Sequence, residues 1–189
     1  DFKGVSLSVS GDKARILRSK IHGLGKSSPI FVSAGDEVVI AYNEIYSWGT
    51  TAECGAARGI NIRAPYPNGT DGATHIKIFR NYIHDQIGYN LETCATDAEF
   101  IAAGQTGSSG RGESHFEGHI HHNLVVNCMG DDEGLGVKSS YNTIEFNHLI
   151  EVRGLNLRLG GYNKFIGNRV EGSNHPGGHR GSYKNLSLG

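Results

Sequence analysis

Short apolar segments recur along the chain in a single register. The segments "RILRSKI", "VVIAYNEI", "IKIFRNYI", "HIHHNLVV", "TIEFNHLI" and "KFIGNRV" align on one polar column. A large apolar residue stands three positions before and two positions after each member of that column, which holds Ser19, Asn43, Asn81, Asn123, Asn147 and Asn168. Six copies without an exception indicate an internal repeat.

The spacing of this repeat predicts the fold class. Members of the column are 24, 38, 42, 24 and 21 residues apart, so the unit is just over 20 residues long with insertions in two places. The segments are short and rich in β-branched residues, and no helical pattern separates them. We therefore expect an all-β fold, a right-handed parallel β-helix in which each repeat forms one coil. The column is predicted to be an internal asparagine ladder at a tight turn, where Asn tolerates left-handed backbone.

A second segment of each repeat also alternates in polarity. By the two-residue period of a strand, "GINIRA", "YNLETC", "GLGVKS" and "GLNLRL" direct these residues inward: Ile60 and Ile62, Leu91 and Thr93, Leu135 and Val137, Leu155 and Leu157. The residues that follow are predicted to point outward on consecutive coils: Arg63, Cys94, Lys138 and Arg158. Lys138 and Arg158 are 20 residues apart in sequence, yet we expect them to lie about one interstrand spacing, roughly 4.8 Å, apart in space.

This row of bases predicts a binding groove for an anion. Two insertions, Ala64 to Thr74 and Ala95 to Ser114, interrupt the coils beside it and would overhang the same face. Adjacent like charges repel, and an extended polymer with one acidic group per sugar would offset that cost. The candidate substrate-binding residues are Arg63, Tyr89, His179 and Arg180. The alternative is that Lys138 and Arg158 are exposed strand residues paired with nearby acids.

The same row suggests acid-base chemistry. A lysine beside a guanidinium has a lowered pKa, because the like charge disfavours the protonated amine, and a general base requires this. Abstraction of the proton α to a uronate carboxylate, followed by loss of the 4-linked sugar, is a β-elimination. That reaction needs a base, a group that neutralises the carboxylate, and a donor to the leaving oxygen.

A metal is one candidate for the neutralising group. Asp131 and Glu133 lie at i and i+2 just before Lys138, and Asn90 or Glu92 of the preceding coil would complete an oxygen-rich site. Hard cations such as calcium prefer such ligands. The alternative interpretation of these acidic residues is a solvated turn. His119 and His121 alternate in one strand, so a metal, acid-base or structural role is open to them.

Composition narrows the partners and the organisation. The 28 glycines and 4 prolines among 189 residues suit short strands joined by turns. With a formal net charge of −1, no nucleic-acid partner is predicted, and without an apolar run of about 18 residues no membrane partner is predicted. Three cysteines without CxxC spacing suggest buried thiols instead of a disulfide framework or zinc site. We expect one β-helix domain over residues 1–189, belonging to a longer protein because the chain starts within the pattern.

The segment "DDEGLGVKSSYNTIEFNHLIEVRGLNLRLGGYNKFIGN" resembles the central motif of polysaccharide lyase family six, the alginate lyases and chondroitinase B, or a closely related β-helical alginate lyase family. In that family a pair of acids precedes a "VKS" strand, and an "LR" strand follows one coil later. The resemblance implies that Lys138 is the Brønsted base and Arg158 the acid or charge stabiliser. It also implies that Asp131, Glu133 and Asn90 bind calcium, and that the protein is bacterial and secreted or periplasmic.

Two other classes of protein fit parts of the pattern. A non-catalytic carbohydrate-binding or tailspike-type module would keep the solenoid without needing lysine and arginine on adjacent coils. A uronan epimerase or an inverting hydrolase would share the fold. The sequence has no tyrosine-aspartate-proline-histidine signature for the epimerase and no cluster of carboxylates for the hydrolase. The favoured prediction is a lyase acting on an anionic polysaccharide, most of all polymannuronate.

Overall fold

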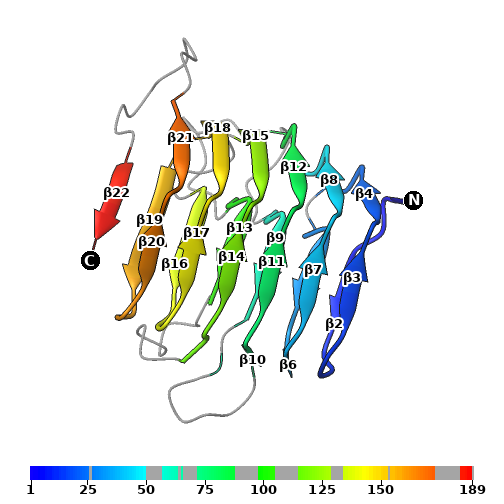
Figure 1. The fold of residues 1–189 in the computed structure, drawn as a ribbon. Coiled ribbons are helices and arrows are strands. Elements are labelled where there is room, and N and C mark those ends of the chain that lie inside the picture. Colours follow the sequence, from blue (N-terminus) through cyan, green and yellow to red (C-terminus); the bar gives the residue numbers. More distant parts are fainter. Residues whose placement is uncertain are drawn as a thin grey trace.

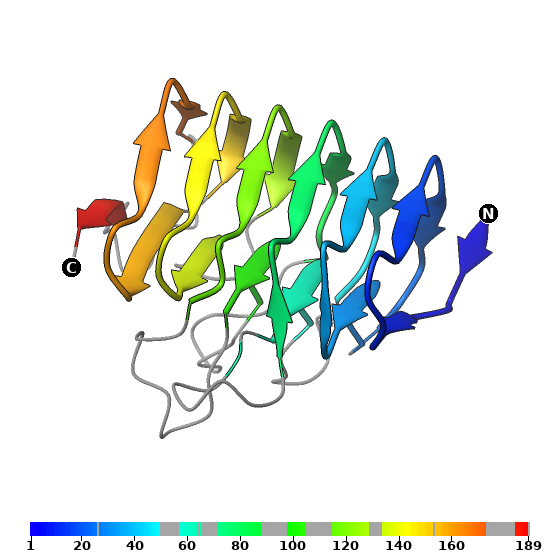
Figure 2. The same cartoon turned by 60° about the horizontal axis from the view of Figure 1, so that its bottom comes forward.

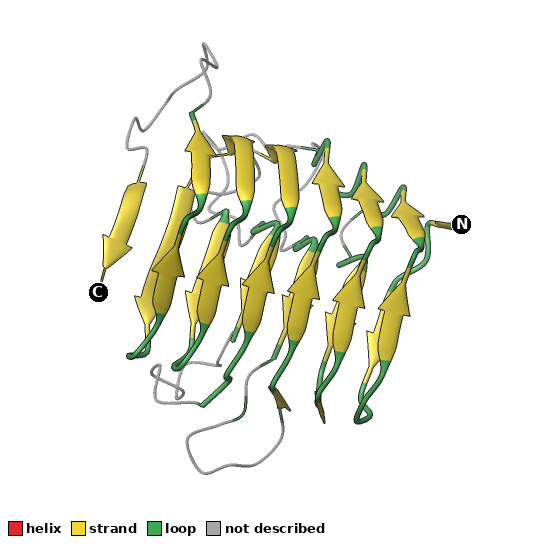
Figure 3. Cartoon of the chain, in the orientation of Figure 1, coloured by secondary structure: helices red, strands yellow, loops and turns green. Residues whose placement is uncertain are grey.

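The predicted parallel β-helix is confirmed by the structure, a computed structural model (Figure 1). It describes residues 1–25, 27–49, 57–63, 65, 72–87, 98–104, 115–128, 134–152, 154–172 and 184–188. All regular structure in these ranges is β-strand (Figure 3), so no helix in them is long and apolar enough to cross a membrane.

The coils stack side by side, and each adds strands to three parallel sheets (Figures 1 and 2). Sheet I contains β1 (Phe2–Lys3), β4 (Lys20–His22), β8 (Glu44–Tyr46), β12 (Tyr82–His84), β15 (Leu124–Cys128), β18 (His148–Val152) and β21 (Arg169–Glu171). Sheet II contains β3 (Arg15–Leu17), β7 (Val39–Ala41), β11 (Lys77–Phe79), β14 (His119–His121), β17 (Thr143–Glu145) and β20 (Lys164–Ile166). Sheet III contains β2 (Leu7–Val9), β5 (Ile30–Val32), β9 (Ile60–Ile62), β13 (Ile101–Ala103), β16 (Leu135–Lys138), β19 (Gly154–Leu159) and β22 (Lys184–Leu188). The short pair β6 (Gly35–Asp36) and β10 (Ala73–Thr74) joins two corners.

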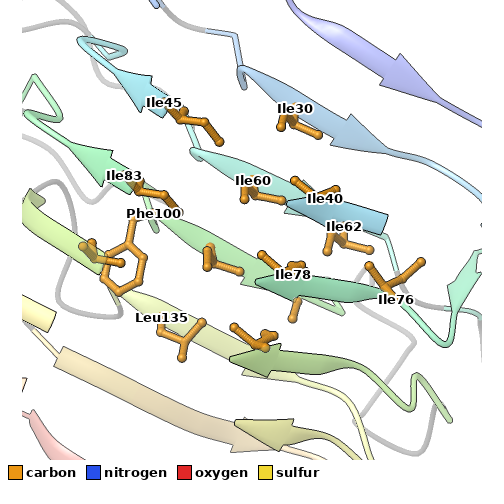
Figure 4. Packing of buried hydrophobic residues seen from close by; sticks show 14 of the residues in the cluster. Ile30, Ile40, Ile45, Ile60, Ile62, Ile76, Ile78, Ile83, Phe100 and Leu135 are labelled. Carbon is orange, nitrogen blue, oxygen red and sulfur yellow. The ribbon is translucent and has the colours of Figure 1, made fainter. Parts of the chain in front are cut away.

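The core lies inside the coils and is built of stacked aliphatic side chains. In sheet III, Ile30, Ile60 and Ile101 occupy one register position on successive coils, and all three are buried. Figure 4 shows these inward columns meeting those of the other two sheets. Because each coil contacts mainly its neighbours, the apolar surface of one repeat is covered only by stacking.

Left-handed residues turn the chain between sheets II and I. The residue before the asparagine column has positive φ on successive coils: 60° at Tyr42, 52° at Arg80, 54° at His122 and 52° at Phe146. The sequence prediction placed the left-handed conformation on the asparagines themselves, and this is wrong, since it is absent from the asparagines of this column. The preceding residue makes the bend, and the asparagine side chain is thereby turned inward.

The asparagine ladder itself is confirmed. The Oδ1 of Asn123 accepts hydrogen bonds from the backbone N–H of Asn81 at 3.0 Å and from its Nδ2 at 2.9 Å. The Nδ2 of Asn123 donates to the carbonyl of Ile78 and to Oδ1 of Asn147. The side-chain oxygen and the side-chain nitrogen of Asn123 are therefore both used between coils. These bonds satisfy backbone donors that the bend leaves without strand partners.

A second asparagine ladder at another corner was not predicted from sequence. The Oδ1 of Asn142 accepts from the backbone of Gly118, and Asn142 in turn donates to Oδ1 of Asn163. It is short, and its members stand in "SYNT" and "GYNK".

One predicted rung of sheet III is replaced. The sequence assigned "YNLETC", with Leu91 and Thr93 inward, to the coil before Lys138; residues 88–97 lie outside the described part of the chain. The strand that pairs with both β9 and β16 is β13, which the prediction had placed inside an insertion. Its sequence "IAA" lacks polar alternation because both of its faces are buried. Gly104, not Cys94, follows this rung.

We expect Asn123→Ala to lower the free energy of unfolding by about 3 kcal/mol, because the buried N–H of Asn81 loses its acceptor. Urea denaturation followed by circular dichroism measures this. The matched control is Asn61→Ala on β9, whose side chain makes no hydrogen bond within the described residues; its change should stay within about 0.5 kcal/mol. Equal losses in the two variants would contradict a special role for the ladder.

A histidine bridge at a third corner should make stability depend on pH. His75 Nδ1 lies 2.6 Å from Oδ1 of Asp36, and its Nε2 lies 3.1 Å from Oε2 of Glu117. The hydrogen bond to Asp36 raises the pKa of His75 above 6.5, and it also holds the pKa of Asp36 below its usual value. Because the raised pKa belongs to the folded state, the stabilisation is complete below pH 6.5 and is lost as the pH rises through the folded-state value.

The stability gap between the wild type and His75→Gln should therefore be larger just below pH 6.5 than well above it. Urea midpoints at the two pH values give this difference. The readout is the change with pH, so a constant cost of placing Gln in a left-handed position does not affect it. A pH-independent gap would mean that the imidazolium pairs contribute nothing.

Candidate active site

The outward face of sheet III is buried over its later coils, on β13, β16 and β19. Ala102, Gly136 and Asn156 share one outward register position on successive coils, and each is buried. Outward positions of sheet I, such as Tyr82 and Leu124, are exposed. Lys138 therefore belongs to a stretch of sheet III in which side chains on both sides of the sheet are buried.

Lys138 is itself buried, and its ammonium group is paired with a carboxylate. Its exposed fraction is 6 %, and Nζ donates to Oε1 of Glu99 at 3.0 Å. The other oxygen of Glu99, Oε2, accepts from Nε of Arg58 at 2.8 Å. Glu99 is fully buried and Arg58 is 5 % exposed. One carboxylate thus holds two cations from different coils.

Local structure brings Arg58 and Glu99 together. Both stand two residues before the first inward isoleucine of their strands, and β9 pairs with β13 so that Ile60 faces Ile101. The chain before each is anchored in a similar way: Trp48 Nε1 donates to the carbonyl of Ala57, and Gln86 Nε2 donates to that of Ala98.

Gly59 is required for this close approach. A Cβ at Gly59 would lie 2.5 Å from the carbonyl oxygen of Phe100 and 2.9 Å from Cζ2 of Trp48. Only glycine lets the two coils pack at this spacing.

Lys138 and Glu99 approach each other along the strand direction. Lys138 ends β16, whereas Glu99 precedes β13, so the two side chains come from opposite ends of the paired strands. Gly136 and Ala102, both small, stand at the outward positions between those ends.

Arg158 lies on the coil next to Lys138, but the two residues are not paired in the register of their strands. In the pairing of β16 with β19, Val137 faces Leu157 and Lys138 faces Leu159, with a register shift between the two rungs. Arg158 is the extra residue of this bulge, a feature that often re-aims side chains beside active sites. Its side chain lies outside the described part of the structure.

The described partner of Lys138 carries the opposite charge to the partner that the sequence predicted. The sequence predicted a neighbouring guanidinium, which favours a neutral amine. The carboxylate of Glu99 favours the charged ammonium instead. Arg58 competes for the same carboxylate, so Glu99 divides its charge between two donors.

Arg63 alone among the predicted substrate-binding residues is described. It follows β9 and is half-buried, two coils away from the strand of Lys138, or roughly 10 Å. Tyr89, His179 and Arg180 lie outside the described residues, as do the predicted calcium ligands Asn90, Asp131 and Glu133. Within the described ranges, His, Cys, Asp and Glu form no group of three that could hold a metal.

The histidines of β14 lie on sheet II, away from Lys138. His119 and His121 project from the same side, with ring centroids 4.1 Å apart. Burial and the two neighbouring histidines lower the pKa of His121 to about 4, so it is neutral near pH 7. His121 also stacks on Phe79 at 4.9 Å, which fits a structural role.

Cys128 is a buried free thiol, as the sequence suggested for the cysteines. Burial raises its pKa well above the usual value, so it is not a reactive thiolate.

Sequence reasoning missed Arg58 and Glu99. The available signal was their shared position two residues before the inward isoleucine in "ARGINI" and "AEFIAA". Had "FIAA" been assigned to a rung of sheet III, opposite charges on adjacent coils would have predicted the pair.

Asn156 adds an unused acceptor to the same face. Its side chain is 3 % exposed, and its Oδ1 has no hydrogen-bond partner among the residues that the structure describes. It stands on β19 beside Gly136. A buried unpaired oxygen costs stability unless something donates to it, and a hydroxyl group of a ligand would do so.

No family model matches the chain, and no curated protein matches it.

We expect Glu99→Gln to lower the free energy of unfolding by about 4 kcal/mol, because it removes the carboxylate shared by two buried cations. Lys138→Met should cost less, since Glu99 keeps Arg58 and methionine fills the volume of the stem. Urea denaturation of both variants tests this order. Glu151→Gln at an exposed corner is the acid-to-amide control, with an expected change within about 0.5 kcal/mol. A Glu99→Gln variant as stable as the control would contradict the shared ion pair.

Proposed function

We propose that this protein is a polysaccharide lyase that cleaves a uronate-containing polymer by β-elimination, with polymannuronate as the first candidate substrate. The observation that carries the proposal is the buried Lys138–Glu99–Arg58 cluster at sheet III. A buried ion pair contributes little net stability compared with apolar packing. Its presence on the face of a strand suggests a use in binding and chemistry.

In the proposed reaction Lys138 takes the C5 proton of the uronate as a neutral amine. Lys138 must lose its ammonium proton before it can act, and Glu99, across the 3.0 Å hydrogen bond, is the acceptor within reach. The C5–H electron pair forms the C4–C5 double bond, and the C4–O bond breaks. The leaving oxygen takes a proton from a donor, for which Arg158 is the candidate on the neighbouring coil.

Other features support a sugar polymer as the substrate. The Oδ1 of Asn156, which has no partner among the described residues, offers an acceptor for a sugar hydroxyl, and Arg63 adds a base on the same sheet. Uronate polymers are extracellular, so the proposal carries a secreted or periplasmic location with it. Calcium bound by Asn90, Asp131 and Glu133 is part of the proposal only through the resemblance to family six.

The test is to incubate the protein with polymannuronate, polyguluronate and dermatan sulfate and to follow the far-ultraviolet absorbance of the unsaturated product. We expect turnover of at least one polymer by the wild type. Lack of product from all three would contradict the lyase, whereas binding without product would favour the non-catalytic carbohydrate-binding module. A parallel set with chelator tests calcium, because activity that survives chelation would exclude a required metal.

Two substitutions at one position separate the roles of Lys138. Lys138→Ala removes both charge and base, whereas Lys138→Arg keeps a charged donor to Glu99 that cannot act as a base near neutral pH. We expect both variants to lose at least about a thousandfold in kcat, within the range ascribed to a general base. Full activity in Lys138→Arg would mean that Lys138 acts only through its charge. Circular dichroism must show that each variant is folded.

A further inference from the structure

A hollow of about 530 Å³ lies on the outward face of sheet II, far around the coil from Lys138 on sheet III. Its lining residues come from or adjoin β7 and the two strands beside it, β3 and β11, which Figure 1 shows side by side. Its lining combines cationic, acidic, apolar and aromatic side chains: Arg15, Asp36, Glu37, Val39, His75, Lys77 and Phe79.

The strand register explains the hollow. Val39 faces Arg15 on one side and Lys77 on the other. Two residues further along β7, Ala41 faces Phe79 of β11. Small apolar residues on the middle coil thus lie between longer side chains on its neighbours, which leaves a trough with an apolar floor.

Two exposed cations stand at this trough. Arg15 and Lys77 are exposed, and neither forms an ion pair or hydrogen bond through its side chain within the described residues. Lys20, by contrast, pairs with Glu44 at 2.8 Å. Two coil spacings separate Arg15 from Lys77, roughly 10 Å, a gap that an acidic group could bridge.

The trough also has an aromatic wall. Phe79 stacks on His121 with an interplanar angle of 6°, and Tyr42 meets it nearly edge-on at 5.6 Å. On the β7 side of Phe79 the neighbour is Ala41, which offers only a methyl group. Part of the Phe79 ring is therefore available to the apolar face of a ligand.

Two carboxylates, those of Asp36 and Glu37, line one end of the trough. Asp36 is held by Thr74 Oγ1 at 2.6 Å and by His75, and Glu37 lies 3.9 Å from Nζ of Lys13. Fixed carboxylate oxygens accept hydrogen bonds from hydroxyl groups. We propose that this trough is a second binding site, distinct from the face of Lys138, for an acidic saccharide whose anionic group lies between Arg15 and Lys77 and whose ring packs on Phe79.

An acidic saccharide fits better than a nucleic acid. Single-stranded nucleic acids need several ring faces for successive bases and a continuous cationic track. Here one ring is available, and Asp36 and Glu37 would repel a phosphate backbone at the end of the trough. The formal net charge of −1 adds no general attraction for a polynucleotide.

Calorimetric titration with an oligomannuronate tests the site. The parent chain carries Lys138→Arg, which the proposed function predicts to be inactive, so the ligand persists. Arg15→Gln/Lys77→Gln should remove one binding event per chain or weaken it at least about tenfold, equivalent to about 1.4 kcal/mol. Lys164→Gln is the matched control, because Lys164 occupies the same outward column at the far end of sheet II. It should leave every binding event unchanged.

Each other outcome overturns the inference. Unchanged binding in the double variant would mean that the trough holds no acidic saccharide. Equal binding of a neutral mannan oligosaccharide would remove the role of the two cations, and tighter binding of a single-stranded DNA oligonucleotide would make the site a polyanion surface. Failure of the lyase is seen separately, as absence of product from the wild type with binding at the trough intact.

Discussion

The hydrogen bonding between coils at the corners is the constraint on which the rest of the structure depends. A residue in the left-handed region, such as Tyr42 or Arg80, turns the chain at each corner between sheets II and I. Such residues cost free energy when they are not glycine. The asparagine that follows offsets this cost by hydrogen bonding to the coils above and below. Coils locked in this register place equivalent residues in straight columns.

Columns bring side chains into contact regardless of their distance in sequence. On the exposed sheets this gives small ion pairs and stacked rings, such as His22 on Tyr46 at 4.6 Å. On sheet III the same register joins Arg58 and Glu99 from adjacent coils and lets Lys138 reach the shared carboxylate. The two proposed binding sites therefore arise from one cause, a departure in side-chain size or charge at one position of an otherwise regular column.

Much of the fold could be predicted because its signal is periodic. The asparagine column and the inward residues Leu135 and Val137 follow from spacing alone, and the pairing of strands confirms them. The ion-pair partner of Lys138, Glu99, could not be predicted in the same way. Glu99 precedes a strand that is apolar on both faces, so the alternation that marks other strands is missing. The insertion around it hid the repeat spacing.

The sequence by itself determined that the chain is a stack of β coils, and that Lys138 takes an outward position on one of them. These are local properties, set by the two-residue period of strands and by turn residues at fixed intervals. The tertiary structure alone decided which charge Lys138 meets and how far it is buried. Those depend on which coil lies beside which and on the bulge at Arg158.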